Sequence, residues 1–306
     1  MVHMLHIVPF FSRHPPSTLV HKLPFSNRSQ SSHCSVRGNT SVSASPSLIV
    51  KQKRPMQKRI IQNKNGENLV GLLHDAGSDE IVVLCHGFCS TKDHATVSNL
   101  ANYLEKEGIS SFRFDFSGNG ESDGTFSYAG YRKEAEDLRA VVEHLNQQNR
   151  VVKVVLGHSK GGCVVLLYAS KYHDIAGVVN VSGRYDLKKG IEERLGPNME
   201  KEMELKGFID VKNKAGRVVY RVTKESLEDR LGTDMHSACE SIDNKCKVFS
   251  VHGSEDGVIP VQDAHEFAKI IPNHSLCIIE GADHCYTMHQ DQLASVVADF
   301  IKSSLH

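Results

Sequence analysis

The chain has 306 residues, enough for one large α/β domain or two small ones, and its apolar content of 40% is ordinary for a folded globular protein. With 36 basic and 36 acidic residues, the formal net charge is zero. This balance excludes the charge signature of nucleic-acid binding, and no apolar run reaches the length of about 18 residues that a transmembrane helix requires.

The first part of the chain has the composition of a targeting leader. Residues 1–66 contain ten Lys or Arg and no acid, and Glu67 is the first acidic residue. Serine is abundant in this stretch, and Pro9 interrupts the apolar segment that a secretory signal would need. We therefore expect residues 1–50 to be a chloroplast transit peptide, cleaved between about Val36 and Val50. The alternative is a disordered tail on a cytoplasmic protein.

Strands and helices then alternate along residues 51–306, the predicted domain. Residues 57–77 read as two strands joined at Asn65-Gly66, a strong hairpin signal. Further strands are predicted at residues 81–87, 109–118, 151–157, 175–183, 246–253 and 275–281. Helices are predicted at residues 94–107, 128–149, 162–172, 261–271 and 290–303. This order predicts an α/β fold with a mostly parallel central sheet and helices on both faces.

Cysteine usage favours a reducing compartment. The eight cysteines form no C-x-x-C pair and follow no regular spacing. Cys85, Cys163 and Cys277 lie inside apolar runs, where a buried thiol acts as a small hydrophobic side chain. This pattern is not that of a secreted, disulfide-stapled domain.

Ser159 lies in the sequence "VVLGHSKGG", at the corner between a predicted strand and a predicted helix. G-x-S-x-G is common by chance and becomes informative only in this context. Because reactive sites in open α/β sheets lie at the carboxyl ends of the strands, Ser159 is a candidate nucleophile. Gly157 and Gly161 are expected because a sharp turn leaves no space for side chains two positions away, and Gly162 lets the helix approach the sheet.

A serine nucleophile needs a base that is oriented by an acid. In "VHGSEDGVIP", Asp256 comes three residues after a strand that ends near Gly253. In "IEGADHCY", His284 comes three residues after a strand that ends near Gly281. The resulting chain order of serine, acid and base is the order of α/β-hydrolases.

Two backbone N–H groups are expected to bind the oxyanion. One belongs to Lys160, directly after the candidate nucleophile, and the other to Phe88, after the predicted strand that leads into "CHGF". His86 and His158 also lie near these positions, and we interpret both as structural rather than catalytic.

From residue 57 to its end, the chain resembles the α/β-hydrolase superfamily. It is most similar to the serine aminopeptidase-like branch that contains feruloyl (cinnamoyl) esterases and monoacylglycerol lipases, and we expect a plant plastid type. The motifs that carry this resemblance are "HGFCSTKDH", "FRFDFSGNGESDG", "GHSKGG", "HGSEDGVIP" and "GADH". The resemblance implies a Ser159–Asp256–His284 triad with Phe88 and Lys160 as oxyanion donors, and it selects Asp256 over the adjacent Glu255.

An insert of about 60 residues, at about 184–240, is too long for a plain connection. It reads as short helices at 187–195 and 198–206, a hairpin at 208–222 and a helix that Thr223 caps and Gly232 ends. In this superfamily such an insert is a lid. Tyr220 or Tyr185 is a candidate for substrate contact, although lid packing is the simpler interpretation of both.

These observations favour a serine hydrolase that cleaves a small-molecule carboxylic ester, of the aryl, cinnamoyl or short acyl type, through an acyl-enzyme. This chemistry needs no metal and no cofactor. The alternatives are a monoacylglycerol or other lipid hydrolase and a receptor-like protein that keeps the triad and binds a ligand without turnover. The sequence carries no signal for an oligomeric state.

Overall fold

The structure, a computed structural model, describes residues 56–305. The predicted leader, residues 1–50, lies outside the described residues. None of the helices in the described part of the chain has the length and apolar character needed to cross a membrane.

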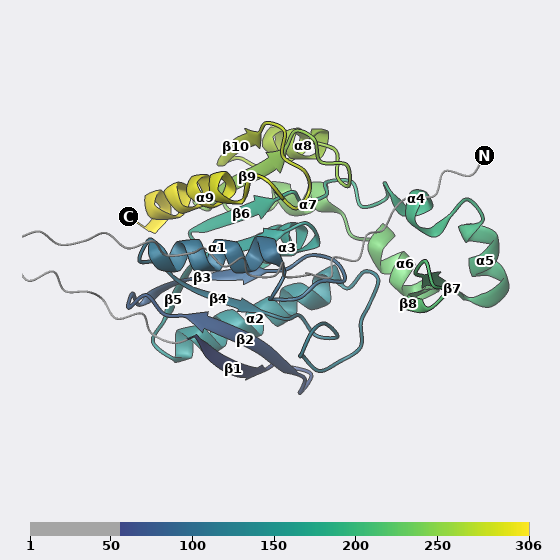
Figure 1. Cartoon of the computed structure of the whole chain (residues 1–306), viewed down its shortest axis with the longest axis horizontal. Coiled ribbons are helices and arrows are strands. Elements are labelled where there is room, and N and C mark those ends of the chain that lie inside the picture. Colours follow the sequence, from purple (N-terminus) through teal and green to yellow (C-terminus); the bar gives the residue numbers. More distant parts are fainter. Residues whose placement is uncertain (1–55, 306) are drawn as a thin grey trace, which may run out of the picture. The chain divides into compact units, whose positions relative to one another are not determined.

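An eight-stranded sheet in the order β1-β2-β4-β3-β5-β6-β9-β10 forms the centre of the domain (Figure 1). Strands β1 and β2 pair antiparallel, β2 pairs antiparallel with β4, and every later pair is parallel. The strands are β1 (Gln57–Gln62), β2 (Asn68–His74), β3 (Glu80–Cys85), β4 (Ser110–Phe114), β5 (Val151–His158), β6 (Gly177–Val181), β9 (Lys247–Gly253) and β10 (His274–Ile279). The predicted fold class is confirmed.

Helices cover both faces of this sheet. On one face α1 and α9 pack together, and on the other α3 packs against α2 and α7 (Figure 1). The helices around the sheet are α1 (Ala95–Lys106), α2 (Tyr131–Gln147), α3 (Lys160–Tyr172), α7 (Met235–Glu240), α8 (Gln262–Ile270) and α9 (Gln290–Leu305). Because both faces are covered, all five residues of β4 and of β6 are buried, as in other parallel sheets.

The first hairpin turns where the sequence predicts. Gly66 adopts a φ of +79°, which an L side chain rarely takes. The Asn63 side chain accepts the backbone N–H groups of Asn65 and Glu67, each at 3.0 Å. A side-chain acceptor of this kind stabilises the turn and fixes the register of β1 against β2.

Strand β4 is shorter than predicted because the chain folds around a buried carboxylate. Asp115, directly after the strand, accepts the backbone N–H of Lys92 at 2.6 Å and that of Glu121 at 3.0 Å. The Lys92 ammonium lies 2.8 Å from the same carboxylate. These bonds tie the turn of residues 115–121 to the loop that follows β3.

The insert forms a small unit with its own core, drawn at the right of Figure 1. It contains α4 (Ile191–Leu195), α5 (Met199–Lys206), the two-stranded sheet of β7 (Phe208–Lys212) and β8 (Val218–Thr223), and α6 (Lys224–Leu231). Thr223 caps α6 by accepting the Ser226 N–H at 3.2 Å, as predicted. The apolar side chains of the insert pack on Tyr128 of the main body.

Helix α7 was not predicted. Its six residues are too few to show a helical period, but Asp234 caps it by accepting the His236 N–H at 2.9 Å. Met235 and Cys239 belong to the core cluster that also contains the side chains of α3. The last helix before β9 therefore packs with the main body rather than with the small core of the insert.

Candidate active site

Ser159 occupies the corner between β5 and α3, as the sequence predicts. Its backbone has φ 57° and ψ −119°, a conformation that is strained for any residue with a side chain. The corner is held because the Ser159 N–H donates to the Val181 carbonyl at 2.8 Å and the Gly162 N–H donates to the Ser159 carbonyl at 2.9 Å. A strained serine between a strand and a helix is the geometry of a nucleophile elbow.

The glycines around this corner are required by space, as predicted. A Cβ atom on Gly157 would lie 2.0 Å from the Gly161 carbonyl oxygen, and one on Gly161 would lie 2.6 Å from the His86 carbonyl oxygen. A Cβ atom on Gly162 would lie 2.3 Å from the Asn180 side chain. Real Cβ contacts are never that short, so any larger residue would open the corner.

The structure brings the three predicted residues into one hydrogen-bonded chain. His284 Nε2 lies 3.0 Å from Ser159 Oγ, and His284 Nδ1 lies 2.7 Å from Asp256 Oδ2. The Asp256 side chain is fully buried and that of His284 is 13% exposed. Glu255 is exposed, so Asp256 is the acid that reaches the histidine.

Asp256 is held as a carboxylate. Its Oδ1 accepts the backbone N–H groups of Val258 at 2.9 Å and Ile259 at 2.8 Å, and His252 Nε2 lies 3.3 Å from its Oδ2. Burial alone would raise the pKa of Asp256, but the hydrogen bonds from His252 and His284 lower that pKa well below its usual range. A permanently ionised Asp256 is able to orient the His284 ring and to stabilise its protonated form.

The two predicted oxyanion donors flank the serine. A Cβ atom on Gly87 would lie 3.1 Å from Ser159 Cβ and 3.6 Å from Ser159 Oγ, so the loop that carries Phe88 passes directly beside the hydroxyl. Lys160 is the first residue of α3, where a backbone N–H has no acceptor within the helix. The geometry therefore allows both N–H groups to act on one oxygen atom.

The Lys160 side chain forms a buried ion pair that the sequence analysis missed. Its Nζ lies 2.6 Å from Glu134 Oε1 on α2, and both side chains are less than a tenth exposed. Burial raises the pKa of Glu134 to about 7, against the opposing effect of Lys160. The pair joins residues 26 positions apart, so no local pattern announces it. It ties the first turn of α3 to α2.

Both ring nitrogens of His86 form hydrogen bonds with backbone atoms. His86 Nδ1 lies 2.8 Å from the Gly87 carbonyl oxygen, and its Nε2 accepts the Phe116 N–H at 3.1 Å. Burial lowers the pKa of His86 to about 4, so the ring is neutral near pH 7. The structural interpretation of this histidine agrees with the geometry.

An aromatic cluster of main-body and insert residues borders the Phe88 side of the site. The Phe88 ring lies 5.3–5.8 Å from three others, and the aromatic cluster consists of Phe88, Phe126, Tyr128 and Tyr220. The Arg194 guanidinium of the insert lies 4.7 Å from the centre of the Phe88 ring. Tyr185 instead packs on Phe267 in the main core. Of the two predicted tyrosines, only Tyr220 belongs to this cluster.

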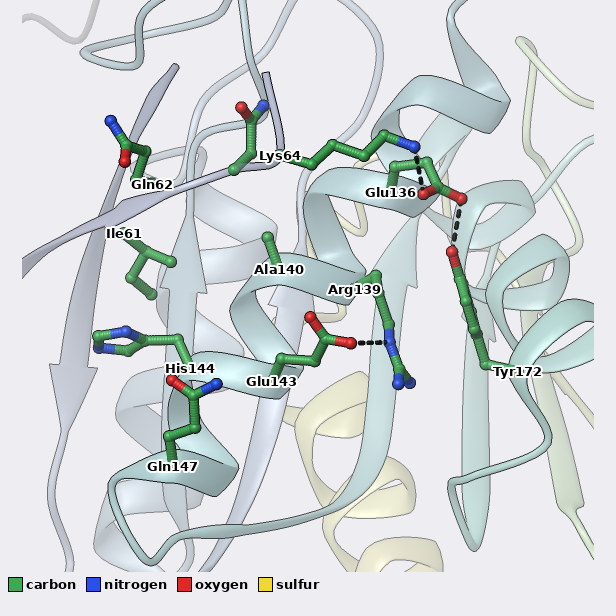
Figure 2. A pocket seen from close by; sticks show the side chains of 11 residues that line it. Ile61, Gln62, Lys64, Glu136, Arg139, Ala140, Glu143, His144, Gln147 and Tyr172 are labelled. Carbon is green, nitrogen blue, oxygen red and sulfur yellow. Dashed lines mark hydrogen bonds and ion pairs between the residues drawn. The ribbon is translucent and has the colours of Figure 1, made fainter. Parts of the chain in front are cut away.

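A separate hollow of about 580 Å³ lies between β1 and α2 (Figure 2). Its wall includes Tyr172, the last of the 13 residues of α3, whereas Ser159 precedes the first. A helix of that length spans about 20 Å, so the hollow is remote from the candidate nucleophile. Glu136 on its wall is held by Lys64 and by the Tyr172 hydroxyl (Figure 2). Its charges are paired, and it carries no sign of reactive chemistry.

Comparison with known proteins places the chain among hydrolases. The family model described as "Serine aminopeptidase, S33" matches residues 76–291. The Saccharomyces cerevisiae protein YDL057W is 27% identical over 231 residues, which are 68% of this chain and 69% of that protein. The mitochondrial palmitoyl-protein thioesterase ABHD10 of Bos taurus is 24% identical over 216 residues, 68% of each chain.

A solved structure supports the fold. The protein described as "Ferulic Acid bound to Est1E from Butyrivibrio proteoclasticus" superposes with a TM-score of 0.70 over 81% of this chain and 99% of that chain. The two sequences are 22% identical.

Proposed function

The chain belongs to the serine aminopeptidase S33 family of α/β-hydrolases, and from that premise we propose that it hydrolyses a small-molecule carboxylic ester with Ser159, His284 and Asp256 as its triad. The observation that carries this proposal is the chain of hydrogen bonds from Ser159 Oγ through His284 to Asp256, at 3.0 and 2.7 Å. Nucleophile, base and acid then follow each other at the distances that proton transfer requires.

The proposed reaction passes through an acyl-enzyme. Ser159 Oγ attacks the ester carbonyl carbon while its proton passes to His284 Nε2. The tetrahedral intermediate collapses, the bond to the alcohol oxygen breaks, and His284 gives its proton to the leaving alcohol. Water then attacks the acyl-enzyme, His284 accepts the water proton, and Ser159 leaves with that proton as the acid is released.

The backbone N–H groups of Phe88 and Lys160 bind the oxygen that becomes negative in both tetrahedral intermediates. Both donors lie on backbone beside the nucleophile, since the Gly87 loop passes next to the Ser159 hydroxyl and Lys160 is the first residue of α3. Preorganised donors of this kind lower the barrier by about 3 kcal/mol each.

The aromatic cluster favours an aryl or cinnamoyl group on the substrate. The Phe88 ring meets its three neighbours edge to face, at 5.3 Å in the case of Tyr220. Flat aromatic groups stack in such surroundings at little entropic cost. That the similar fold of Est1E is described with ferulic acid bound supports a substrate of the same chemical class.

A second candidate is a lipid-type ester or thioester. Exposed apolar side chains lie close in sequence to the acid and the base: Val258, two residues after Asp256, is 48% exposed, and Met288, four residues after His284, is 86% exposed. The name of the related ABHD10 protein states a palmitoyl-protein thioesterase. The same triad attacks a thioester carbonyl, with a thiol in place of the alcohol as leaving group.

The proposal is tested with wild type and Ser159→Ala on aryl acetates, methyl ferulate, monoacylglycerols and a palmitoyl thioester. We expect turnover of the aryl and feruloyl esters and labelling by a fluorophosphonate probe, and we expect both to disappear in the variant. A preference for long acyl chains selects the lipid hydrolase or thioesterase. Binding of an ester without turnover by wild type selects a receptor-like protein.

A further inference from the structure

His158 is buried directly beside the base. It is the last residue of β5, its side chain is only 3% exposed, and its neighbour in the chain is the candidate nucleophile. His158 Nε2 lies 2.8 Å from the backbone carbonyl oxygen of His284. A carbonyl oxygen only accepts, so His158 Nε2 carries the hydrogen and donates it.

The ring of His158 contacts two other histidine rings. The His158 and His284 rings lie 5.0 Å apart, and the His94 ring stacks on the His158 ring at 5.7 Å and 16°. Burial and the neighbouring His284 lower the pKa of His158 to about 3. At neutral pH the ring is therefore uncharged, and the bond to the carbonyl fixes its tautomer.

The consecutive residues His158 and Ser159 thus contact His284 at two points, its backbone carbonyl and its ring. Ser159 Oγ lies 3.0 Å from the His284 ring, and the His158 ring holds the His284 carbonyl. The next carbonyl, that of Cys285, is held separately by Gln290 at 2.6 Å. The two peptide groups that follow the catalytic imidazole are therefore held, one by the nucleophile corner and one by α9.

We propose that His158 is a positioning residue, which fixes His284 against Ser159 by donating a hydrogen bond to the His284 backbone carbonyl. The inference rests on the proposed function, in which Ser159 and His284 are nucleophile and base. It assigns a task to a side chain that neither attacks the substrate nor transfers its proton. Without this bond the His284 carbonyl is no longer tied to the residue before the nucleophile, and the ring is able to shift relative to Ser159 Oγ.

The expected effect is on the chemical step. A displacement of about 1 Å between reacting groups costs up to about a hundredfold in rate. Substrate binding depends on the aromatic cluster, which His158 does not touch, so KM stays unchanged. We expect kcat to fall by about 10- to 100-fold when the donor is lost.

The decisive comparison is between His158→Gln and His158→Met. Both side chains are unbranched and similar in length, but only glutamine places an N–H donor near the position of His158 Nε2. We expect the Gln variant to retain most of the wild-type kcat and the Met variant to lose 10- to 100-fold, with KM unchanged in both. The rate of fluorophosphonate labelling of Ser159 should fall in parallel with kcat, since it depends on the same base.

His158→Phe is the second variant, because it keeps the ring and removes the donor, and it should behave like the Met variant. His94→Phe is the control, since it keeps the stacking on His158 and has no bond to His284. Equal kcat in the Gln and Met variants overturns the inference, as does a loss of kcat in the control as large as in the Met variant. If wild type neither hydrolyses esters nor labels, the proposed function fails instead, so the two failures are distinguishable.

Discussion

We name the two sides of the candidate site after their proposed roles, a triad side and a lid side, and the two are built by different means. On the triad side, Ser159, Asp256 and His284 each follow a strand of the same sheet and meet at 2.7–3.0 Å. On the lid side, the rings of the aromatic cluster meet at 5.3–6.1 Å between the main body and the insert. Hydrogen bonds fix direction as well as distance, whereas ring contacts tolerate rotation and sliding.

The two sides also differ in how far their apolar side chains are buried. The core of the insert is small, and apolar side chains remain on its surface, with Leu205 75% exposed and Val219 56% exposed. Ser159 instead rests on a sheet that is covered on both faces. A protein that carries out one reaction on varied substrates benefits from this division, because the reaction depends on exact angles and selectivity depends on an adaptable surface.

The largest effect is expected when the acid of the triad side is replaced. Asp256→Asn should lower kcat by about four decades, because the His284 tautomer and its protonated form lose their support. The matched control is Glu255→Gln, which removes an exposed carboxylate from the adjacent position and should leave kcat near wild type. Steady-state kinetics with an aryl ester measure both. If Glu255→Gln were inactive and Asp256→Asn were near wild type, the acid would be Glu255 and the assignment of Asp256 would be wrong.

A smaller effect is expected on the lid side. Tyr220→Ala removes one wall of the aromatic cluster and should raise KM for a feruloyl ester about 5- to 10-fold, since an aromatic pair contributes about 0.5–1.5 kcal/mol beyond its buried area. KM for a short acetate ester and the rate of fluorophosphonate labelling should not change. Tyr185→Phe is the control, because that ring packs on Phe267 outside the cluster. An equal loss for all substrates would show that Tyr220 supports the fold rather than selectivity.

Much of the triad side was predictable because its signals are local. A strand that ends in Gly157, a serine and a helix that begins with small residues are visible in a short stretch, and the loops of Asp256 and His284 follow their strands in the same way. The ion pair of Lys160 with Glu134 and the contact of His158 with the His284 carbonyl were not predictable. They join residues 26 and 126 positions apart, and only the folded sheet brings them together.

The lid side was predictable in its elements but not in its contacts. The caps and turns of the insert, such as Thr223 and Gly216, have local signatures. Which tyrosine faces Phe88 depends on how the insert packs on the main body, and no periodicity encodes that packing. The short helix α7 was missed for a related reason, since it is stabilised by packing against α3 rather than by its own sequence.

Acidification should destabilise the fold through the buried side chain of His158. Burial lowers the pKa of His158 to about 3, while an unfolded histidine titrates near about 6.5. Between these values the unfolded chain binds a proton that the folded chain does not, so this stability is fully present above about pH 6.5 and is lost as the pH falls.

The measurement is the midpoint of urea unfolding at several pH values from 7 to 5. We expect this midpoint to decrease as the pH falls. His158→Gln should reduce the slope of this decrease, because it removes one of the buried groups. Burial of Glu134, whose pKa is raised to about 7, acts in the opposite direction, so Glu134→Gln should steepen the decrease. Parallel slopes in wild type and His158→Gln would contradict this account.

The smallest expected effect concerns the predicted leader, residues 1–50. A chain that starts at Lys51 should fold and hydrolyse esters with the kcat and KM of the full chain, because all the candidate site residues and both core clusters of the sheet lie after residue 60. Fused to a fluorescent protein, residues 1–60 should enter plastids, since import depends on a serine-rich, acid-free composition rather than on a fold. Entry into mitochondria or retention in the cytosol would overturn the plastid assignment. A shortened chain that is unstable or less active would show that the leader takes part in folding, and the division of the molecule into a triad side and a lid side would then omit a third contributor.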